Sequence, residues 1–123
     1  MYTIRKEFSC CSSHVLTGLP KEHPCARLHG HNYVITVELK SRSLNTTGFV
    51  EDYRQLDDIK YWIDNIMDHH HLNDIFDFNP TAENMAAHMY KIFKKEHPTL
   101  CAVEVSETPK TIARFEPGTD ITS

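Results

Sequence analysis

The sequence predicts an α+β protein in which two helices cover one face of an antiparallel sheet. Residues 2–13 are rich in β-formers, and from residue 29 onward apolar and polar side chains alternate, which is typical of strands. Apolar residues then recur at helical spacing in two stretches, and two further β-rich stretches follow them. Strands and helices grouped in the order ββααββ are typical of this fold class.

Two strands are expected first. Tyr2 to Ser13 contains no helix signal and is interpreted as the first strand. The second strand begins at His29, and its apolar side is formed by Tyr33, Ile35, Val37 and Leu39. Residues 41–48 then form a polar turn that leads into Phe49-Val50, interpreted as the short second arm of a hairpin.

Two amphipathic helices are expected next. The first begins at residue 52 or 53 and ends at residue 67, because apolar residues recur there at helical spacing: Leu56, Ile59, Ile63 and Ile66. Residues 68–80 show no regular pattern and form a long connection. The second helix begins near Thr81, with Asn79 or Thr81 as its cap, and Pro98 marks its end.

Two short strands complete the predicted fold. Residues 102–106 and 111–115 are interpreted as strands separated by a Pro109-Lys110 turn. Such a sheet has open edges and one uncovered face, which favours self-association. The length of 123 residues predicts a single domain over residues 1–123.

The composition excludes several classes of protein. Lys plus Arg number 13 against 17 Asp plus Glu, and the net charge of −4 argues against nonspecific nucleic-acid binding. No apolar run approaches the roughly 20 residues of a membrane helix, and the N-terminus turns polar before a signal-peptide core forms. Four cysteines without CxxC pairing make a disulfide framework a poor interpretation, so a reducing compartment, the cytoplasm, is predicted.

The strongest local feature is the motif His29-Gly30-His31. Residues two apart on a strand point to the same face, so His29 and His31 can reach one metal ion side by side. His14, at the end of the first strand, is the best placed third ligand, and three imidazoles leave a fourth position open for substrate or water. In the alternative interpretation the pair begins a half-buried strand and makes ordinary hydrogen bonds.

Cys25 lies four residues before His29. A thiolate near zinc and imidazoles can serve as a general base, a nucleophile or a fourth ligand. A lone cysteine is also a common small buried hydrophobe, which is the interpretation of Cys101.

Asp68 directly precedes His69, and a carboxylate beside a histidine can fix its tautomer and form an acid–base pair. The alternative is a solvated polar loop, which is preferred for His70 and His71. Three other histidines are expected at the surface: His23, His88 and His97.

Glu107 is the last candidate. It shares a strand face with Val103 and Val105, and a carboxylate on an apolar face is either paired or functional. A buried Glu107 could accept a fork of N–H donors from a heterocycle.

Together these motifs resemble the family of 6-pyruvoyltetrahydropterin and 6-carboxytetrahydropterin synthases. The resemblance runs from Phe8 through Glu107. It is carried by Phe8 to His14, Cys25-x-x-x-His29-Gly30-His31, Gly48-Phe49-Val50-Glu51-Asp52-Tyr53, Asp68-His69, Leu72-Asn73, Pro80-Thr81-Ala82-Glu83-Asn84 and Glu107-Thr108. The fold of this family, the tunnelling fold (T-fold), is a four-stranded antiparallel sheet with two helices, in agreement with the order predicted from the pattern.

The resemblance implies a role for each candidate residue. It implies that zinc is held by His14, His29 and His31, that Cys25 is the proton-abstracting base with Asp68 and His69 as acid–base partners, and that Glu107 and Thr81 bind the pterin. It also implies a homohexamer of stacked trimers with active sites shared between subunits.

The implied reaction converts 7,8-dihydroneopterin triphosphate to 6-carboxy-5,6,7,8-tetrahydropterin, with release of acetaldehyde and triphosphate, in the queuosine (7-deazaguanine) pathway. The three residues between Cys25 and His29 favour this carboxy branch, because its bacterial members have the same spacing and the animal-type pyruvoyl synthases place more residues there. The alternatives are a 6-pyruvoyltetrahydropterin synthase, a zinc hydrolase or hydratase, and a non-enzymatic zinc- or pterin-binding module. Candidate cations for the triphosphate are Arg27, Lys21 and Lys6.

Overall fold

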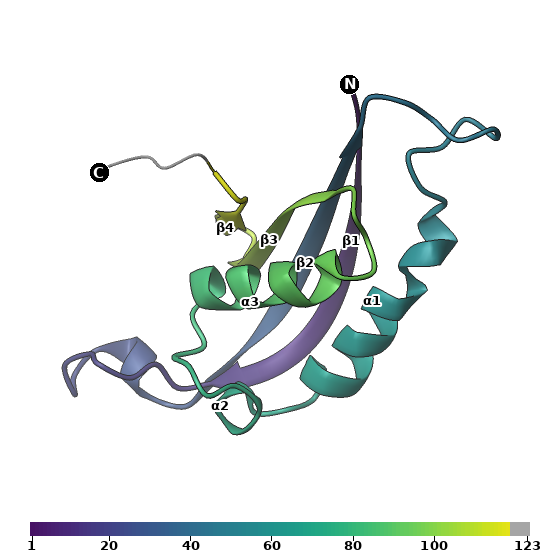
Figure 1. Ribbon diagram of the computed structural model, residues 1–123. Coiled ribbons are helices and arrows are strands. Elements are labelled where there is room, and N and C mark those ends of the chain that lie inside the picture. The colour runs from purple at the N-terminus through teal and green to yellow at the C-terminus, as the bar shows by residue number, and fades with distance from the viewer. Residues whose placement is uncertain (119–123) are drawn as a thin grey trace.

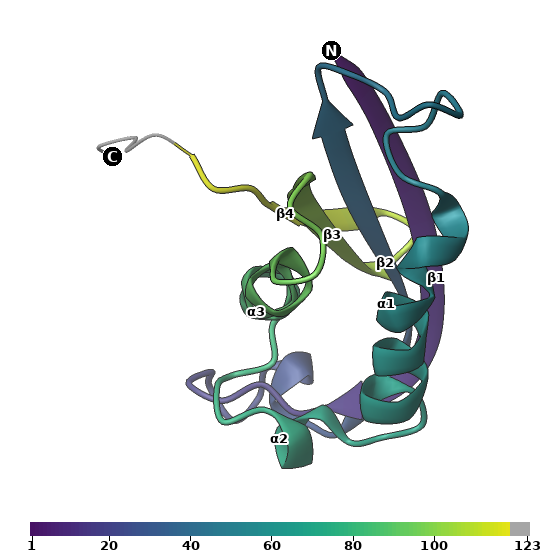
Figure 2. The ribbon, with the colours of Figure 1, turned by 45° about the vertical axis from the view of Figure 1, so that its right-hand side comes forward.

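The structure is a computed structural model that describes residues 1–118, and its centre is a four-stranded antiparallel sheet (Figure 1). The strands lie in chain order: β1 (Tyr2–His14), β2 (His29–Ser41), β3 (Leu100–Thr108) and β4 (Thr111–Phe115). Helices α1 and α3 cover one face of this sheet (Figure 2). The predicted fold class and the order ββααββ are confirmed. No helix among the described residues has the length and apolar character needed to cross a membrane.

The β1–β2 hairpin sets the position of the candidate site. Its register pairs Tyr2 with Ser41 at one end and His14 with His29 at the other. The end that carries the histidines continues into the loop of residues 15–28. The predicted strand at Phe49-Val50 is wrong, because β2 pairs with β1 and β3 instead.

Residues 45–49 form a tight turn in place of that strand. The side chain of Asn45 accepts the backbone N–H groups of Thr47, Gly48 and Phe49. Gly48 has a φ of +100°, a conformation that glycine adopts without a steric penalty. This side-chain turn satisfies the local backbone and removes the need for a strand partner.

The first predicted helix forms over the expected residues, with three successive geometries. A tight turn (Tyr53–Leu56) leads into α1 (Asp57–Trp62), and the run ends in a wider turn (Ile63–Met67). Asp52 caps the start by accepting the amide of residue 54. The amide of Asp68 bonds to the carbonyl five residues earlier, so the helix ends directly before the predicted acid–base pair.

The connection after that helix contains a short helix, α2 (Leu72–Ile75), that the sequence did not predict. One turn is too short to show a hydrophobic period. Helix α3 (Ala82–Lys94) begins where expected, and the hydroxyl of Thr81 accepts the amide of Asn84, which selects Thr81 as its cap. The helix ends four residues before Pro98.

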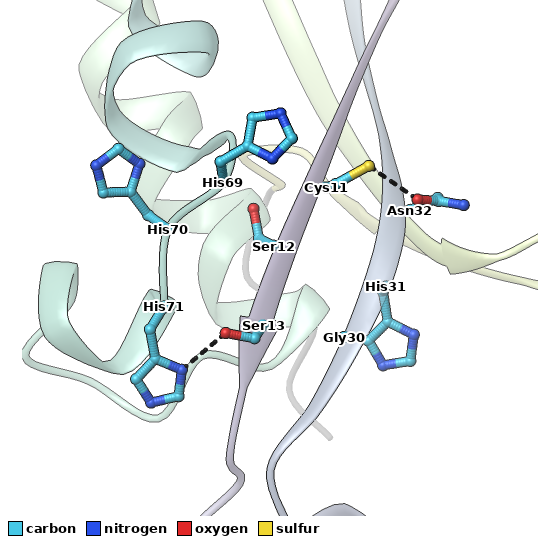
Figure 3. Close-up of a pocket in the computed structure, with 9 residues that line it drawn as sticks. All are labelled: Cys11, Ser12, Ser13, Gly30, His31, Asn32, His69, His70 and His71. Carbon is cyan, nitrogen blue, oxygen red and sulfur yellow. Dashed lines mark hydrogen bonds between the residues drawn. The ribbon is translucent and has the colours of Figure 1, made fainter.

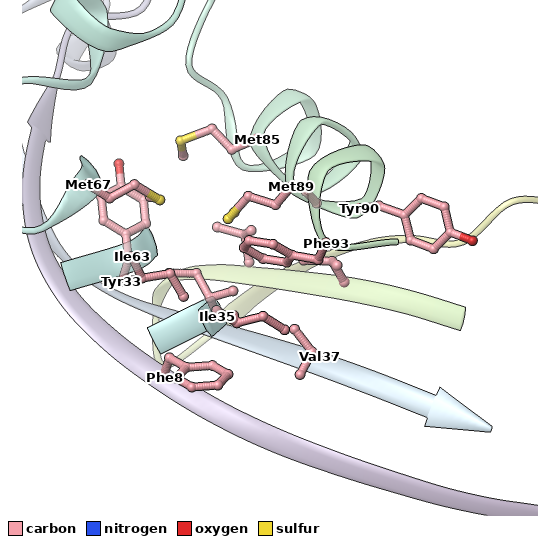
Figure 4. Close-up of a cluster of buried hydrophobic side chains, with 14 of the residues drawn as sticks. Phe8, Tyr33, Ile35, Val37, Ile63, Met67, Met85, Met89, Tyr90 and Phe93 are labelled. Carbon is pink, nitrogen blue, oxygen red and sulfur yellow. The ribbon is translucent and has the colours of Figure 1, made fainter. Parts of the chain in front are cut away.

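The core lies between the sheet and the two helices (Figure 4). The alternating side chains predicted for β2 are all fully buried there, and α3 contributes the apolar face predicted from its spacing: Ala82, Met85, Ala86, Met89 and Phe93. The agreement follows from side-chain direction, since strand and helix periods place these residues on the faces that meet.

The uncovered face of the sheet is charged. Arg5 and Arg114 each bind both Glu38 and Glu104, with N–O distances from 2.6 to 2.9 Å. The hydrogen bond from Arg114, with help from Arg5, lowers the pKa of Glu38 to about 2. Cys101 lies beside this network, where its half-buried Sγ donates to the Glu38 carbonyl, so the interpretation of Cys101 as a buried hydrophobe is wrong.

His97 was expected at the surface, and that expectation is also wrong. It is 3% exposed, and its two ring nitrogens lie 2.8 Å from Glu51 Oε1 and 2.9 Å from Asp58. The imidazole thus joins the loop before α1, α1 itself and the segment that leads into β3. Two carboxylates on one ring favour the doubly protonated form, which has two donors.

These contacts predict a pH-dependent contribution to stability. Burial lowers the pKa of His97, but the hydrogen bonds to Asp58 and Glu51 outweigh burial, so the pKa is raised above 6.5. Stability from a raised histidine pKa is full below about pH 6.5 and is lost as pH rises through the folded-state pKa. We expect His97→Asn to cost about 3 kcal/mol of unfolding free energy at pH 6 and less at pH 9. Urea unfolding at both pH values measures this; an equal cost at both would contradict it.

Candidate metal and substrate site

Three histidines meet at the end of the β1–β2 hairpin. His29 and His31 lie two residues apart on β2, and His14 is the direct partner of His29 on β1. One ligand atom from each ring can be chosen so that all lie within 4.8 Å of one another, a spacing that could hold one metal ion. The cluster predicted from the spacing is therefore assembled by the register of the hairpin.

Hydrogen bonds on the far side of two rings set which nitrogens face the cluster. His14 Nδ1 lies 2.9 Å from the Pro80 carbonyl, and His29 Nδ1 lies 2.6 Å from the Arg27 carbonyl. Each carbonyl requires a donor, so each Nδ1 carries the proton and each neutral ring has a free lone pair on Nε2. These two Nε2 atoms lie 2.9 Å apart. Two lone pairs that face each other repel unless a cation lies between them.

His31 supplies the third nitrogen. Its Nε2 is buried and makes no hydrogen bond within residues 1–118, and the nearest carboxylate oxygen, Glu107 Oε2, is 3.6 Å away. A buried polar atom without a partner costs free energy, which a bound ion would remove. Three neutral imidazoles are a donor set that suits zinc and several transition metals.

The surroundings of His14 keep its ring in the form that binds metals. The side chain is fully buried, and burial lowers the pKa of His14. The hydroxyl of Tyr33 lies 3.1 Å from His14 Nδ1, on the side opposite the cluster. Sequence reasoning did not assign Tyr33 to the site, although it follows His31 by two residues and so lies on the same strand face.

Glu107 lies between the histidines and a second feature, a cavity of about 170 Å³ beside the start of α3. The cavity is lined by Ala82, Glu83, Val105, Glu107, Thr111, Ile112 and Ala113. Thr81 directly precedes this lining, and its hydroxyl is engaged as the cap of α3. The structure therefore brings Glu107 next to the histidines and Thr81 next to the cavity that Glu107 lines.

Cys25 lies on the loop that joins the two histidine-bearing strands. It is half-buried in a tight turn (Pro24–Ala26), where its carbonyl accepts the amide of Leu16 at 2.9 Å. Its backbone N–H donates to His23 Nδ1 at 3.0 Å, but within residues 1–118 its thiol makes no hydrogen bond and does not belong to the three-histidine cluster.

Asp68 and His69 form the expected pair, with Nε2 of His69 3.4 Å from Asp68 Oδ2. Asp68 is fixed because its Oδ1 accepts the amide of Cys11 at 2.8 Å. His69 has a φ of +59° and a side chain that is 81% exposed, and it does not belong to the three-histidine cluster.

His69 lines a cavity of about 460 Å³ that His31 of the cluster also borders (Figure 3). Residues 69–71 border one side of it, while β1 and β2 contribute Cys11, Ser12, Ser13, Gly30, His31 and Asn32. His70 is exposed, as expected. His71 is half-buried and its Nδ1 lies 3.0 Å from the Ser13 hydroxyl, so it is not the freely solvated residue that was expected.

The candidate cations for a triphosphate divide into two groups. Lys6 lies eight residues before His14 on the same strand, which places it about 26 Å from the cluster at a rise of about 3.3 Å per residue. Arg27 and Lys21 are exposed on the loop of residues 15–28. Lys6 is therefore excluded as a partner of its own chain's site.

Comparisons with known proteins agree on one family. The family model described as 6-pyruvoyl tetrahydropterin synthase matches residues 3–118. A curated 6-carboxy-5,6,7,8-tetrahydropterin synthase of Rickettsia bellii is 28% identical, over 87% of this chain and 93% of the relative. That of Bacillus subtilis is 27% identical, over 94% of this chain and 86% of the relative.

A solved structure gives the same result. The 6-pyruvoyl tetrahydropterin synthase of Caenorhabditis elegans superposes with a TM-score of 0.83 at 27% identity, covering 95% of this chain and 96% of that one. The family model spans nearly all the described residues, including every residue of the histidine cluster. The chain therefore belongs to the 6-pyruvoyl tetrahydropterin synthase family.

Proposed function

We propose that this chain is a zinc-dependent carbon–carbon lyase that converts 7,8-dihydroneopterin triphosphate to 6-carboxy-5,6,7,8-tetrahydropterin, with release of acetaldehyde and triphosphate. The observation that carries the proposal is the set of three imidazoles beside Glu107, two of them with facing Nε2 lone pairs. The names of the Rickettsia and Bacillus relatives support the carboxy branch, as does the three-residue spacing from Cys25 to His29. This reaction belongs to the queuosine pathway of the cytoplasm, where the four free cysteines stay reduced.

Each candidate residue has a distinct task in this proposal. Zinc, when held by the three histidines, supplies Lewis acidity to the hydroxyl groups of the substrate side chain. The Cys25 thiolate takes a proton from that side chain. Glu107, which lines the cavity beside the start of α3, accepts N–H donors of the pterin ring, and Thr81 and the neighbouring backbone help to hold the ring.

We assign Asp68 and His69 to the active site of a neighbouring subunit. His69 is exposed and lies outside the cluster of its own chain, and Asp68 is held against β1, so the pair presents a protonatable ring outward. In an assembly, His69 oriented by Asp68 would relay protons in the adjacent site.

The assembly proposed is a homohexamer of two stacked trimers. Its support is the two open edges of the sheet: residues 69–71 cover only the end of β1, and β4 has no outer neighbour within the described residues. Light scattering after gel filtration is expected to give about 86 kDa, six times the 14.3 kDa chain. A 14.3 kDa monomer at micromolar concentration would contradict the hexamer and the shared site.

The decisive experiment identifies the products. Zinc-loaded, reduced protein is incubated with 7,8-dihydroneopterin triphosphate, and the products are separated and identified by mass spectrometry. Carboxytetrahydropterin with acetaldehyde is the expected result. Pyruvoyltetrahydropterin would move the chain to the pyruvoyl branch, and bound zinc without turnover of any dihydropterin would favour a binding module.

Glu107→Ala is expected to weaken binding of the pterin ring about 100-fold, the effect of losing hydrogen bonds to a charged group worth about 3 kcal/mol. Quenching of protein fluorescence by a pterin without the triphosphate measures this affinity directly. Glu83→Ala is the matched control, because Glu83 lines the same cavity and is exposed. Equal affinities of the two variants would remove Glu107 from the role of pterin anchor.

A further inference from the structure

Two asparagine side chains bind the backbone of the segment that follows His14. Asn73 accepts the Val15 N–H through Oδ1 and donates to the Val15 carbonyl through Nδ2, both at 2.8 Å. Asn79 makes the same pair of bonds to Thr17, at 3.0 and 3.1 Å. Each carboxamide thus clamps one residue: it satisfies both the N–H and the C=O group of that residue's backbone, as a neighbouring strand would.

Leu16 lies between these two clamped residues and bonds elsewhere. In an extended segment, successive residues direct their backbone groups to opposite sides. With Val15 and Thr17 held on one side, the N–H of Leu16 faces the other side, where it donates to the Cys25 carbonyl at 2.9 Å. The two asparagines therefore set the direction of the bond that ties the Cys25 turn to the end of β1.

The loop of residues 15–28 has little else to hold it. None of these residues is fully buried, and its other backbone bonds, between Pro20 and His23 and within residues 23–27, are local. A loop without buried apolar side chains gains its position from hydrogen bonds to neighbouring segments. For this loop those bonds come from Asn73 and Asn79 at its start and from His29 Nδ1, which donates to the Arg27 carbonyl at its end.

The same connection also contacts the metal cluster and the start of α3. The carbonyl of Pro80 accepts from His14 Nδ1, and the carbonyl of Asn79 accepts from Asn84 Nδ2 in the first turn of α3. Residues 73–80 thus join the end of β1, the Cys25 loop and the helix that Thr81 caps.

We propose that Asn73 and Asn79 are positioning residues that hold the Cys25 thiol in place relative to the metal ion bound by His14, His29 and His31. The inference rests on the proposed function of Cys25 as the base. Asparagine is required because each clamp needs one donor and one acceptor; aspartate has no donor, and its charge would face a carbonyl oxygen.

The test compares Asn73→Ala and Asn79→Ala with Asn65→Ala. Asn65 is exposed and bonds only within its own helical run, to the Tyr61 carbonyl. Zinc affinity, kcat, KM and the alkylation rate of Cys25 are measured for each protein, with peptide mass spectrometry to separate Cys25 from the other cysteines. Asn79→Asp, which keeps the acceptor but not the donor, is a second variant at the Asn79–Thr17 clamp, the more exposed of the two.

For Asn73→Ala and Asn79→Ala we expect zinc affinity and KM to stay within about twofold of the control, while kcat falls about 10- to 100-fold, the usual effect of misplacing a reacting group. Zinc should accelerate Cys25 alkylation in the wild-type protein, because a nearby cation favours the thiolate, and this acceleration should disappear in both variants. Asn79→Asp should behave like Asn79→Ala.

Three results would overturn the inference. They are a kcat within twofold of the control, a loss of zinc together with activity, and a wild-type Cys25 whose alkylation does not respond to zinc. A wild-type protein that turns over no dihydropterin would instead refute the proposed function, and the zinc dependence of Cys25 alkylation would still decide whether the asparagines position the thiol.

Discussion

His29→Ala is expected to lower zinc affinity at least about 100-fold and to reduce turnover by at least the same factor. Protein zinc sites have binding free energies of about 10 to 16 kcal/mol shared over four ligands, so one ligand contributes about 3 kcal/mol. His29 is the histidine to replace, because it is half-buried, whereas His14 is fully buried and its loss would also disturb the core. Competition with a chromophoric zinc chelator measures the affinity, and elemental analysis measures the content.

His70→Ala is the control for this experiment. His70 is exposed and belongs to the other run of histidines, where its Nδ1 contacts only the Asp68 carbonyl. It should bind zinc as the wild-type protein does. If His70→Ala lost zinc while His29→Ala kept it, the metal would lie in the run of residues 69–71 and the site proposed here would be wrong.

The histidine cluster could be predicted because it depends on short-range geometry. The alternation along β2 places His29 and His31 on one face, and a hairpin between the first two strands returns His14 to the same end. The same alternation predicted the buried side of β2. The two-residue period of a strand therefore predicted the candidate ligands, and the strand and helix periods together predicted the core.

Features that depend on distant partners could not be predicted in this way. The Phe49-Val50 strand was wrong because a side-chain turn at Asn45 closes that segment. His97 was placed at the surface because nothing local marks Glu51 and Asp58 as its partners. The two errors have different causes: at Phe49-Val50 an apolar pair was taken for a strand although β2 pairs with β1 and β3, whereas His97 was taken as exposed because a polar residue is expected at the surface unless its distant partners are known.

The two asparagine clamps illustrate a further limit. The sequence singled out Leu72-Asn73 as part of the family resemblance but gave Asn73 no task. A side chain that binds a backbone leaves no pattern in the partner segment, because every residue has the same N–H and C=O groups. Only the placement of residues 73–79 against residues 15–17 reveals the contact.

Cys25→Ala is expected to lower kcat about 1000-fold while zinc content stays at the wild-type level. Proton transfer by a positioned side chain contributes about 100- to 10,000-fold to a rate, and alanine removes the thiol without touching an imidazole. Cys101→Ala is the matched control, because Cys101 is also half-buried and bonds only to Glu38. Product formation and zinc content are measured on the same samples.

The two substitutions are most informative together, because they separate binding of the metal from removal of the proton. If His29→Ala loses zinc and turnover while Cys25→Ala loses turnover alone, the histidines are ligands and the cysteine is the base. If Cys25→Ala also loses zinc, the thiol is a fourth ligand, and no open position would remain for the substrate hydroxyl groups. Another group would then have to abstract the proton. The exposed His69, which lies beside Asp68, is the other acid–base candidate proposed for the shared site.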